Sequence, residues 1–160
     1  RVHLLSTAAA GNWWLETSLG FSDGEIAYNS CTARSDAALH LHEGSANVRV
    51  HHNTLQPIEN GSTGENTVSV RSRAYGISIH ENDVLRIAGA TSSAIYVDDT
   101  CTGGGSIRGN RLRISGGMGG VFVNCANWDV DPLSMPGVDV SFYNNNNGGL
   151  LAGGGAGPVC

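Results

Sequence analysis

Short segments with alternating apolar and polar residues recur along the chain. In one of them Val50 is followed three positions later by Asn53 and five positions later by Leu55. A two-residue alternation of this kind is typical of β-strands with one buried face. We therefore predict strands here, with Val50 and its equivalents facing inward. The segments that share the order of an apolar residue, Asn and a second apolar residue are 26–31, 48–55, 77–84 and 107–112.

A second series of segments alternates along the chain with these Asn-bearing segments. Each segment of the second series is a triplet with an apolar residue on each side of a variable residue. These triplets are 39–41, 68–70, 95–97 and 121–123. The first three are followed after 9, 9 and 10 residues by the inward residue of the next Asn-bearing segment. The last interval, from Val123 to Val140, is 17 residues long and contains Trp128 and two prolines. We expect an excursion loop there, followed by a final Asn-family strand at 138–142.

The recurring asparagines indicate how the two series are arranged. Their spacings are 24, 29 and 28 residues, and a period in the twenties indicates stacked units, each too small to bury its own apolar face. We predict an all-β parallel solenoid of about five coils. Each Asn is expected where a strand ends and the chain turns, since Asn tolerates left-handed backbone geometry there, with its amide bonded to the next Asn in an internal structural ladder. The ladder residues are Asn29, Asn53, Asn82 and Asn110.

This repeat resembles that of right-handed parallel β-helix proteins, which include pectate lyases, polygalacturonases, alginate and chondroitin lyases, and bacteriophage tailspikes. The resemblance covers about residues 24–147 and implies the fold rather than a particular activity. Residues 1–23 are then a further coil or a cap, and residues 148–160 are a glycine-rich tail. The chain does not begin with Met, which is expected of a processed or excised piece of a longer chain. A solenoid also exposes its terminal coils, so we expect either a longer chain or a homo-oligomer that covers them. The resemblance also implies an extracellular or virion-surface location.

Charge and composition exclude several classes of partner. The formal net charge is −5 and all nine cations are Arg, so a phosphate backbone would be repelled and we predict no nucleic-acid partner. No apolar run reaches the length of a membrane span. The four cysteines contain no C-x-x-C pair and therefore do not support a zinc ribbon. Their even number permits two disulfides, but their spacing does not decide whether these form. The cysteines are Cys31, Cys101, Cys125 and Cys160.

The outward positions of the second series are expected to form two rows on one face of the solenoid. Aromatic faces stack on pyranose rings, and charged groups bind hydroxyls or uronate carboxylates, so these rows predict a polysaccharide ligand. Arg73 lies two positions beyond Arg71 and is expected to contribute to the same ligand-binding face. The aromatic row is His40, Ser69, Tyr96 and Phe122, and the charged row is His42, Arg71, Asp98 and Asn124. The predicted substrate-binding residues are His40, Tyr96, Phe122, Asn124 and Arg73.

Two enzymatic mechanisms would use the charged row, with Asp98, Arg71 and His42 as candidate catalytic residues. A lyase would use Arg71 to neutralise a uronate carboxylate, while His42 or Arg71 removes the α-proton. A hydrolase would use the carboxylates of Asp98 and Asp99 as acid and as base or nucleophile. Neighbouring carboxylates on one strand point to opposite sides, so the alternative for Asp99 is a corner position in which it bonds turn amides.

The pair Asp98–Asp99 is similar to the paired Asp of polygalacturonases. The Asn-Thr-Asp, Gly-His-Gly and Arg-Ile-Lys elements of that family are absent, and this chain contains no Lys. This departure argues against polygalacturonase activity. The preferred function is a polysaccharide-interacting module of the tailspike or adhesin kind. The alternatives are a polysaccharide lyase or glycosidase that uses the same residues, and a purely structural solenoid of a spike or filament.

A third outward row belongs to the Asn-bearing series and includes two histidines one repeat apart. His51 and His80, with Glu81, have the donor atoms for a shared metal ion. A third well-placed ligand is not evident and stacked histidines also occur on solenoid faces without a ligand. We therefore predict neither a metal nor any other cofactor. The expected members of this row are Ala27, His51, His80, Arg108 and Ser141.

Overall fold

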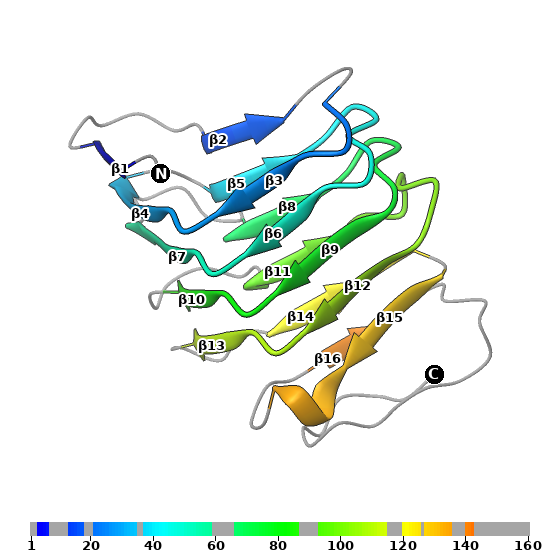
Figure 1. Cartoon of the computed structure of the whole chain (residues 1–160). Helices are drawn as coiled ribbons and strands as arrows, with labels where there is room; N and C mark the ends of the chain where they lie inside the picture. Colours follow the sequence, from blue (N-terminus) through cyan, green and yellow to red (C-terminus); the bar gives the residue numbers. More distant parts are fainter. Residues whose placement is uncertain are drawn as a thin grey trace.

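The chain folds into β-strands arranged in three parallel sheets (Figure 1). The computed structural model describes residues 3–6, 13–17, 21–34, 37–58, 66–86, 93–114, 120–125, 127–135 and 140–142. Within these residues the only helical element is a 3₁₀ turn, η1 (Pro132–Ser134). The predicted all-β class and the parallel stacking of strands are thus confirmed. The described part of the chain has no helix that is long and apolar enough to cross a membrane.

Apart from the last described strand, each sheet collects every third strand of the chain. Sheet I contains β1 (His3–Ser6), β4 (Ser30–Arg34), β7 (Thr54–Ile58), β10 (Asp83–Arg86) and β13 (Arg111–Ile114). Sheet II contains β2 (Trp13–Thr17), β5 (Ala37–Leu41), β8 (Val68–Val70), β11 (Ile95–Val97), β14 (Val121–Val123) and β16 (Val140–Phe142). Sheet III contains β3 (Glu25–Ala27), β6 (Arg49–His51), β9 (Ile77–His80), β12 (Gly105–Arg108) and β15 (Trp128–Asp131).

The order in which the chain visits the sheets is cyclic. It passes from sheet I to II to III and returns to sheet I, so that each strand lies beside the equivalent strand of the next repeat (Figure 1). At the end of the described chain β16, in sheet II, is the next strand after β15, in sheet III. The pairing is parallel throughout, as in Val50 beside Ile79 and Ile79 beside Ile107. This arrangement is compatible with a parallel β-helix, because stacked circuits of this kind bury a continuous core that no single circuit has.

The sequence pattern predicted two strands per repeat, whereas the structure has three. The apolar residue five positions after each inward residue, such as Leu55 after Val50, belongs to a separate strand in sheet I. The Asn lies at the corner between the two strands, and the residue before it turns the chain with a positive φ. These turning residues are Tyr28 (φ 58°), His52 (φ 54°), Glu81 (φ 54°) and Gly109 (φ 63°). At each of these corners the left-handed conformation is thus adopted by the residue before the Asn.

The stretch expected to be an excursion loop contains β15, which continues sheet III beside β12. Val130 pairs with Ile107, and Met135, five positions later, is buried like Leu55 and Val84. Because Leu133 replaces the corner Asn, the pattern did not identify this strand. The segment at 138–142 was placed in the wrong series, since β16 pairs with β14 in sheet II and Ser141 lies beside Phe122 rather than beside Arg108.

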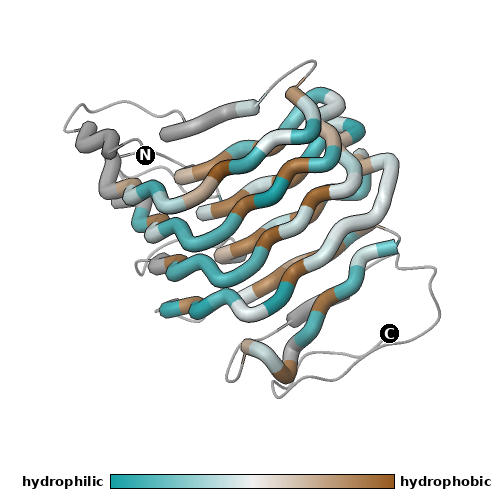
Figure 2. Tube along the Cα trace, viewed as in Figure 1, coloured by the Kyte–Doolittle hydropathy of each residue, from teal (hydrophilic) through white to brown (hydrophobic). Residues whose placement is uncertain are grey.

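The core is formed by aliphatic side chains that stack from one repeat to the next. Val50, Ile79 and Ile107 are fully buried in sheet III, and Val68, Ile95 and Val121 are fully buried in sheet II. Burial of such side chains stabilises the fold by about 1.5–3 kcal/mol each. The hydrophobic positions repeat at equivalent places on successive strands (Figure 2). The inward direction predicted for Val48, Val50, Ile77, Ile79 and Ile107 agrees with their complete burial.

The corner asparagines are hydrogen-bonded to one another. The side-chain amide of Asn53 donates to Oδ1 of Asn82 at 2.9 Å, and that of Asn82 donates to Oδ1 of Asn110 at 2.9 Å. Asn29 donates in the same way to Asn53 at 3.0 Å. The backbone N–H of each donor residue also reaches the same oxygen, as in Asn82 N to Asn110 Oδ1 at 3.0 Å. Three of the four asparagines are buried, and these bonds supply hydrogen-bond partners for their side chains.

Strands β1 and β2 lie within residues 1–23 and pair with β4 and β5, so this segment contributes to sheets I and II. The predicted glycine-rich tail, residues 148–160, lies outside the described residues, and Cys160 with it.

Candidate functional site

The outer face of sheet II carries the aromatic row in the expected register. His40 is the partner of Ser69, Ser69 of Tyr96, and Tyr96 of Phe122. The flanking residues of each strand, such as Val68 and Val70, point into the core, so alternation places the row outside. The rings of Tyr96 and Phe122 stack with their centroids 5.1 Å apart and their planes 14° apart. This pair forms a flat, partly exposed aromatic surface.

The charged row lies immediately after the ends of the same strands. Backbone hydrogen bonds continue the sheet by one residue here, from Arg71 N to Leu41 O and from Asp98 N to Val70 O, both at 2.9 Å. Asn124 N donates to Val97 O in the same manner. The structure therefore brings Arg71, Asp98 and Asn124 into line next to the aromatic row.

Arg71 links the two rows. Its guanidinium carbon lies 5.3 Å from the centroid of the Tyr96 ring, and its Nε lies 4.0 Å from Oδ2 of Asp98. A guanidinium over an aromatic face is attracted by the electron density of the ring, and the contact holds the side chain against the sheet. His42 packs edge-on against His40, with ring centroids 4.6 Å apart.

Burial divides the predicted substrate-binding residues. His40 is only 3% exposed and Ser69 is fully buried, whereas Tyr96 and Phe122 are partly exposed. We therefore assign His40 to support of His42 rather than to ligand contact. Arg73 is exposed, but it lies in the turn after β8 with a positive φ of 64° and its backbone N donates to Thr100 O. Arg73 is therefore attached to the turn after β8 and is not a member of the charged row.

Asp98 and Asp99 have different surroundings. Oδ1 of Asp98 accepts a hydrogen bond from the backbone N of Thr100 at 2.7 Å, so Asp98 bonds an amide of the turn that follows its strand. Burial alone would raise the pKa of Asp98, but hydrogen bonds from Thr100 and Asp99 and the positive charge of Arg71 outweigh it and lower that pKa. The hydrogen bond to Asp98, together with its negative charge, raises the pKa of Asp99. The two carboxyl groups are therefore driven apart in acidity.

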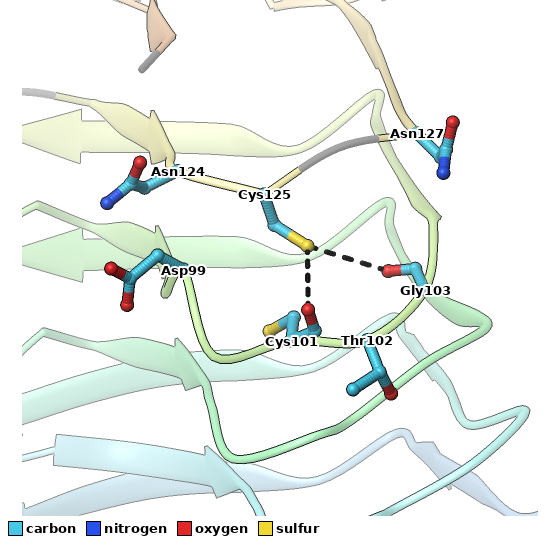
Figure 3. Close-up of a pocket in the computed structure, with 7 residues that line it drawn as sticks. All are labelled: Asp99, Cys101, Thr102, Gly103, Asn124, Cys125 and Asn127. Atoms are coloured by element: carbon cyan, nitrogen blue, oxygen red, sulfur yellow. Dashed lines mark hydrogen bonds between the residues drawn. The ribbon is translucent and has the colours of Figure 1, made fainter. Parts of the chain in front are cut away.

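A pocket of about 330 Å³ opens at the corner that follows β11 and β14 (Figure 3). Asp99 and Asn124 lie close together at one end, and Asn127 lies at the other. Polar side chains predominate around it, and one of them, Asn124, belongs to the charged row. The lining residues are Asp99, Cys101, Thr102, Gly103, Asn124, Cys125 and Asn127.

Two cysteines form the floor of this pocket. Cys125 Sγ lies 3.3 Å from the carbonyl oxygen of Cys101 and 3.8 Å from that of Gly103, within donor distance of both (Figure 3). Cys101 Sγ donates to Val70 O at 3.4 Å. Cys31, Cys101 and Cys125 are all buried. Sequence reasoning did not place Cys101 and Cys125 at a site, although their separation of 24 residues equals one repeat and was the available signal.

The histidine row of sheet III is only partly as expected. His51 and His80 stack in parallel, with centroids 4.9 Å and planes 11° apart, so their nitrogens lie side by side rather than facing a common point. Among the described residues, no group of three or more His, Cys, Asp or Glu side chains is arranged to hold a metal ion.

Comparisons of this chain with protein-family models, with curated protein sequences and with solved structures gave no match.

Proposed function

We propose that the chain is a polysaccharide-interacting module that holds an extended glycan along the outer face of sheet II. The observation that supports this most directly is the strip in which Arg71 lies over Tyr96 and Tyr96 stacks on Phe122. A pyranose ring presents one apolar face and a rim of hydroxyls, and this strip offers an aromatic surface beside charged and amide groups. The adjoining corner pocket extends the strip by way of Asn124.

The architecture that we propose for this module is a right-handed parallel β-helix of about five coils, with the corner asparagines as its structural ladder. A solenoid repeats the same outward position on every coil, which suits a ligand that is itself a repeating chain. We propose an extracellular or virion-surface location and an assembly of several copies or a longer chain, since terminal coils of a solenoid otherwise expose sheet edges.

The test is retention of the protein on a panel of acidic and neutral polysaccharides, for example polyuronates and neutral glucans. Tyr96→Ala and Arg71→Ala should each weaken retention by at least about tenfold, because each removes a contact of about 1.4 kcal/mol or more. The matched control is Arg49→Ala, which removes an exposed guanidinium from sheet III and should leave retention unchanged. Equal retention of all variants at unchanged melting temperature would refute the site, and concentration-dependent assembly without any glycan affinity would favour a purely structural solenoid.

A second candidate function, glycan cleavage, is favoured by the opposite displacement of the pKa values of Asp98 and Asp99. Opposite shifts of this kind separate the acidities of two carboxyl groups, as a general acid and a base in one site require. Incubation with the same panel separates the mechanisms: new ultraviolet absorbance from unsaturated uronates indicates a lyase that uses Arg71 and His42. New reducing ends without that absorbance indicate a hydrolase that uses Asp98. Absence of both signals leaves binding without catalysis.

A further inference from the structure

Two consecutive histidines face each other at the corner between sheets III and I. Nδ1 of His51 lies 2.8 Å from Nδ1 of His52. Consecutive side chains on a regular strand point to opposite faces, so this approach requires a break in the strand. The break is His52 itself, whose φ of 54° turns the chain and brings its ring to the side of His51.

The outer nitrogen of each ring is directed toward a carboxylate. Nε2 of His51 lies 2.5 Å from Oε1 of Glu25, and Nε2 of His52 lies 3.5 Å from Oε2 of Glu81. A carboxylate accepts hydrogen bonds, so the hydrogen of the short contact lies on Nε2 of His51. Oε2 of Glu81 also lies 3.3 Å from Nδ1 of His80, so this carboxylate is shared between His52 and His80.

Nδ1 of His51 and Nδ1 of His52 therefore converge on one point and are joined there by a hydrogen bond. A metal ion can take the place of the hydrogen between them, because imidazole ligands give up that proton when they bind a metal. We propose that Nδ1 of His51 and Nδ1 of His52 together bind a divalent transition-metal ion of the kind that prefers imidazole, such as Cu²⁺ or Zn²⁺. Nitrogen–metal bonds of about 2.0–2.1 Å at a roughly tetrahedral angle separate the two nitrogens by about 3.3–3.4 Å. Formation of the site thus needs the two nitrogens to move apart by about half an ångström.

The surroundings hold both rings in this position. Glu25 orients His51 in the carboxylate–histidine arrangement that is typical of metal ligands, and it is itself 3.7 Å from Arg49. Tyr28 stacks on His52 with centroids 5.0 Å apart, and His80 stacks on the ring of His51. The side chain of His51 is 11% exposed and that of His52 is 43% exposed, so the ion is reached from the His52 side.

Only two protein ligands converge here, so water or an added ligand completes the coordination. Such an open site exchanges its metal more readily than a closed structural site, and its imidazole donors select against hard ions such as Ca²⁺ and Mg²⁺. This inference does not depend on the proposed glycan site, which lies on sheet II.

The experiment is a titration of the chelator-treated whole chain with Cu²⁺ and Zn²⁺, with Ca²⁺ as the hard-ion control. ¹⁵N-resolved NMR with Zn²⁺ should show metal coordination at Nδ1 of His51 and His52, with their Nε2 atoms still protonated. We expect one equivalent of Cu²⁺ or Zn²⁺ and no response to Ca²⁺. His52→Asn keeps a residue that tolerates the positive φ but removes the imidazole, and it should weaken binding by at least about tenfold. Glu25→Ala should weaken it by about tenfold or more through loss of ring orientation.

The control variant is His42→Ala, which removes a histidine from sheet II and should bind the metal as the unchanged chain does. The proposal is overturned if His52→Asn, folded by its melting temperature, retains full metal affinity, or if His42→Ala loses it. It is also overturned if no metal binds and NMR finds a hydrogen on one of the two Nδ1 atoms, since a shared proton then resolves the contact.

Discussion

Oδ1 of Asn82 accepts two hydrogen bonds from Asn53, one from the backbone N at 3.1 Å and one from the side-chain amide at 2.9 Å. The amide of Asn82 lies in turn 3.0 Å from the carbonyl oxygen of Val50, in the preceding repeat. One side chain therefore joins successive repeats at the corner where the parallel sheets themselves are interrupted.

Replacement of Asn82 by Ala should lower the free energy of unfolding by about 1–3 kcal/mol, because two donors of Asn53 and the acceptor of Asn110 lose a buried partner. Denaturant unfolding monitored by circular dichroism measures the change. The comparison variant is Asn29→Ala, which lies at the partly exposed end of the row, where water replaces the lost bonds. An Asn82→Ala protein as stable as the original would contradict the structural role of the row, and glycan retention should be the same in both.

His40 predicts a loss of stability in mild acid. Burial, with smaller contributions from His42 and Arg71, lowers the pKa of His40 to about 4, below the value of about 6.5 in the unfolded chain. Between these two pH values the unfolded chain binds a proton at this imidazole and the folded chain does not. The contribution of His40 to the free energy of unfolding is therefore complete above pH 6.5 and is lost as the pH is lowered toward 4. The loss from this residue amounts to at most about 3 kcal/mol.

Thermal unfolding measured between pH 4 and 7 tests this prediction. The variant His40→Gln cannot titrate in this range, so its melting temperature should depend less on pH than that of the unchanged chain. Identical pH dependence of the two proteins would show that His40 does not carry the effect.

Cys101 should be an unreactive thiol in the folded protein. Burial, reinforced by the neighbouring Cys125 and Asp98, raises the pKa of Cys101 far above the usual value, so the nucleophilic thiolate is scarce near neutral pH. We expect alkylation of Cys101 at pH 7.5 to be at least about tenfold slower in the native chain than in denaturant. Mass spectrometry of the labelled peptide measures both rates, and equally fast labelling in the two states would contradict the buried position.

Gly105 is required by close packing between sheet III strands. A Cβ at this position would lie 2.4 Å from the carbonyl oxygen of Ile77 and 2.7 Å from the indole of Trp128. Because one of these atoms belongs to the backbone of a paired strand, Gly105→Ala should destabilise the fold by about 2–3 kcal/mol.

The matched control is Gly44→Ala, at a position with a φ of 80° and no atom within 4 Å of an added Cβ. Only backbone strain opposes that change, and we expect it to cost about 1 kcal/mol. Chemical denaturation of both variants gives the comparison. If Gly105→Ala proved the milder of the two, the packing of Trp128 against Gly105 would not be as described.

Much of the solenoid arrangement was predictable because it rests on local repetition. The inward positions of Val50, Ile79 and Ile107 follow from strict alternation, and the period of the asparagines shows that these strands are equivalent. Strand β15 was missed because Leu133 takes the corner position of the Asn, although Val130 and Met135 keep the apolar spacing. The rows containing Tyr96 and Arg71 came from the same alternation, continued into the residue after each strand.

The positions of side chains at the corners were not predictable from this pattern. The hydrophobic alternation carries no information about a positive φ, so neither the third sheet nor the approach of His51 to His52 was visible in it. The lining of the corner pocket, including Cys125 and Asn127, depends on how turns from two successive repeats meet.

The sequence by itself therefore determined which aliphatic positions of the repeat are buried, which Asn-bearing strands are equivalent and which side chains follow one another in the rows of Tyr96 and Arg71. These properties depend on a two-residue alternation and a nearly constant repeat length, both of which are local. The tertiary structure decided the number of sheets, the burial of His40 and the facing nitrogens of His51 and His52. These depend on backbone rotation at single corner residues and on hydrogen-bonded register across repeats, which only the folded stack of strands specifies.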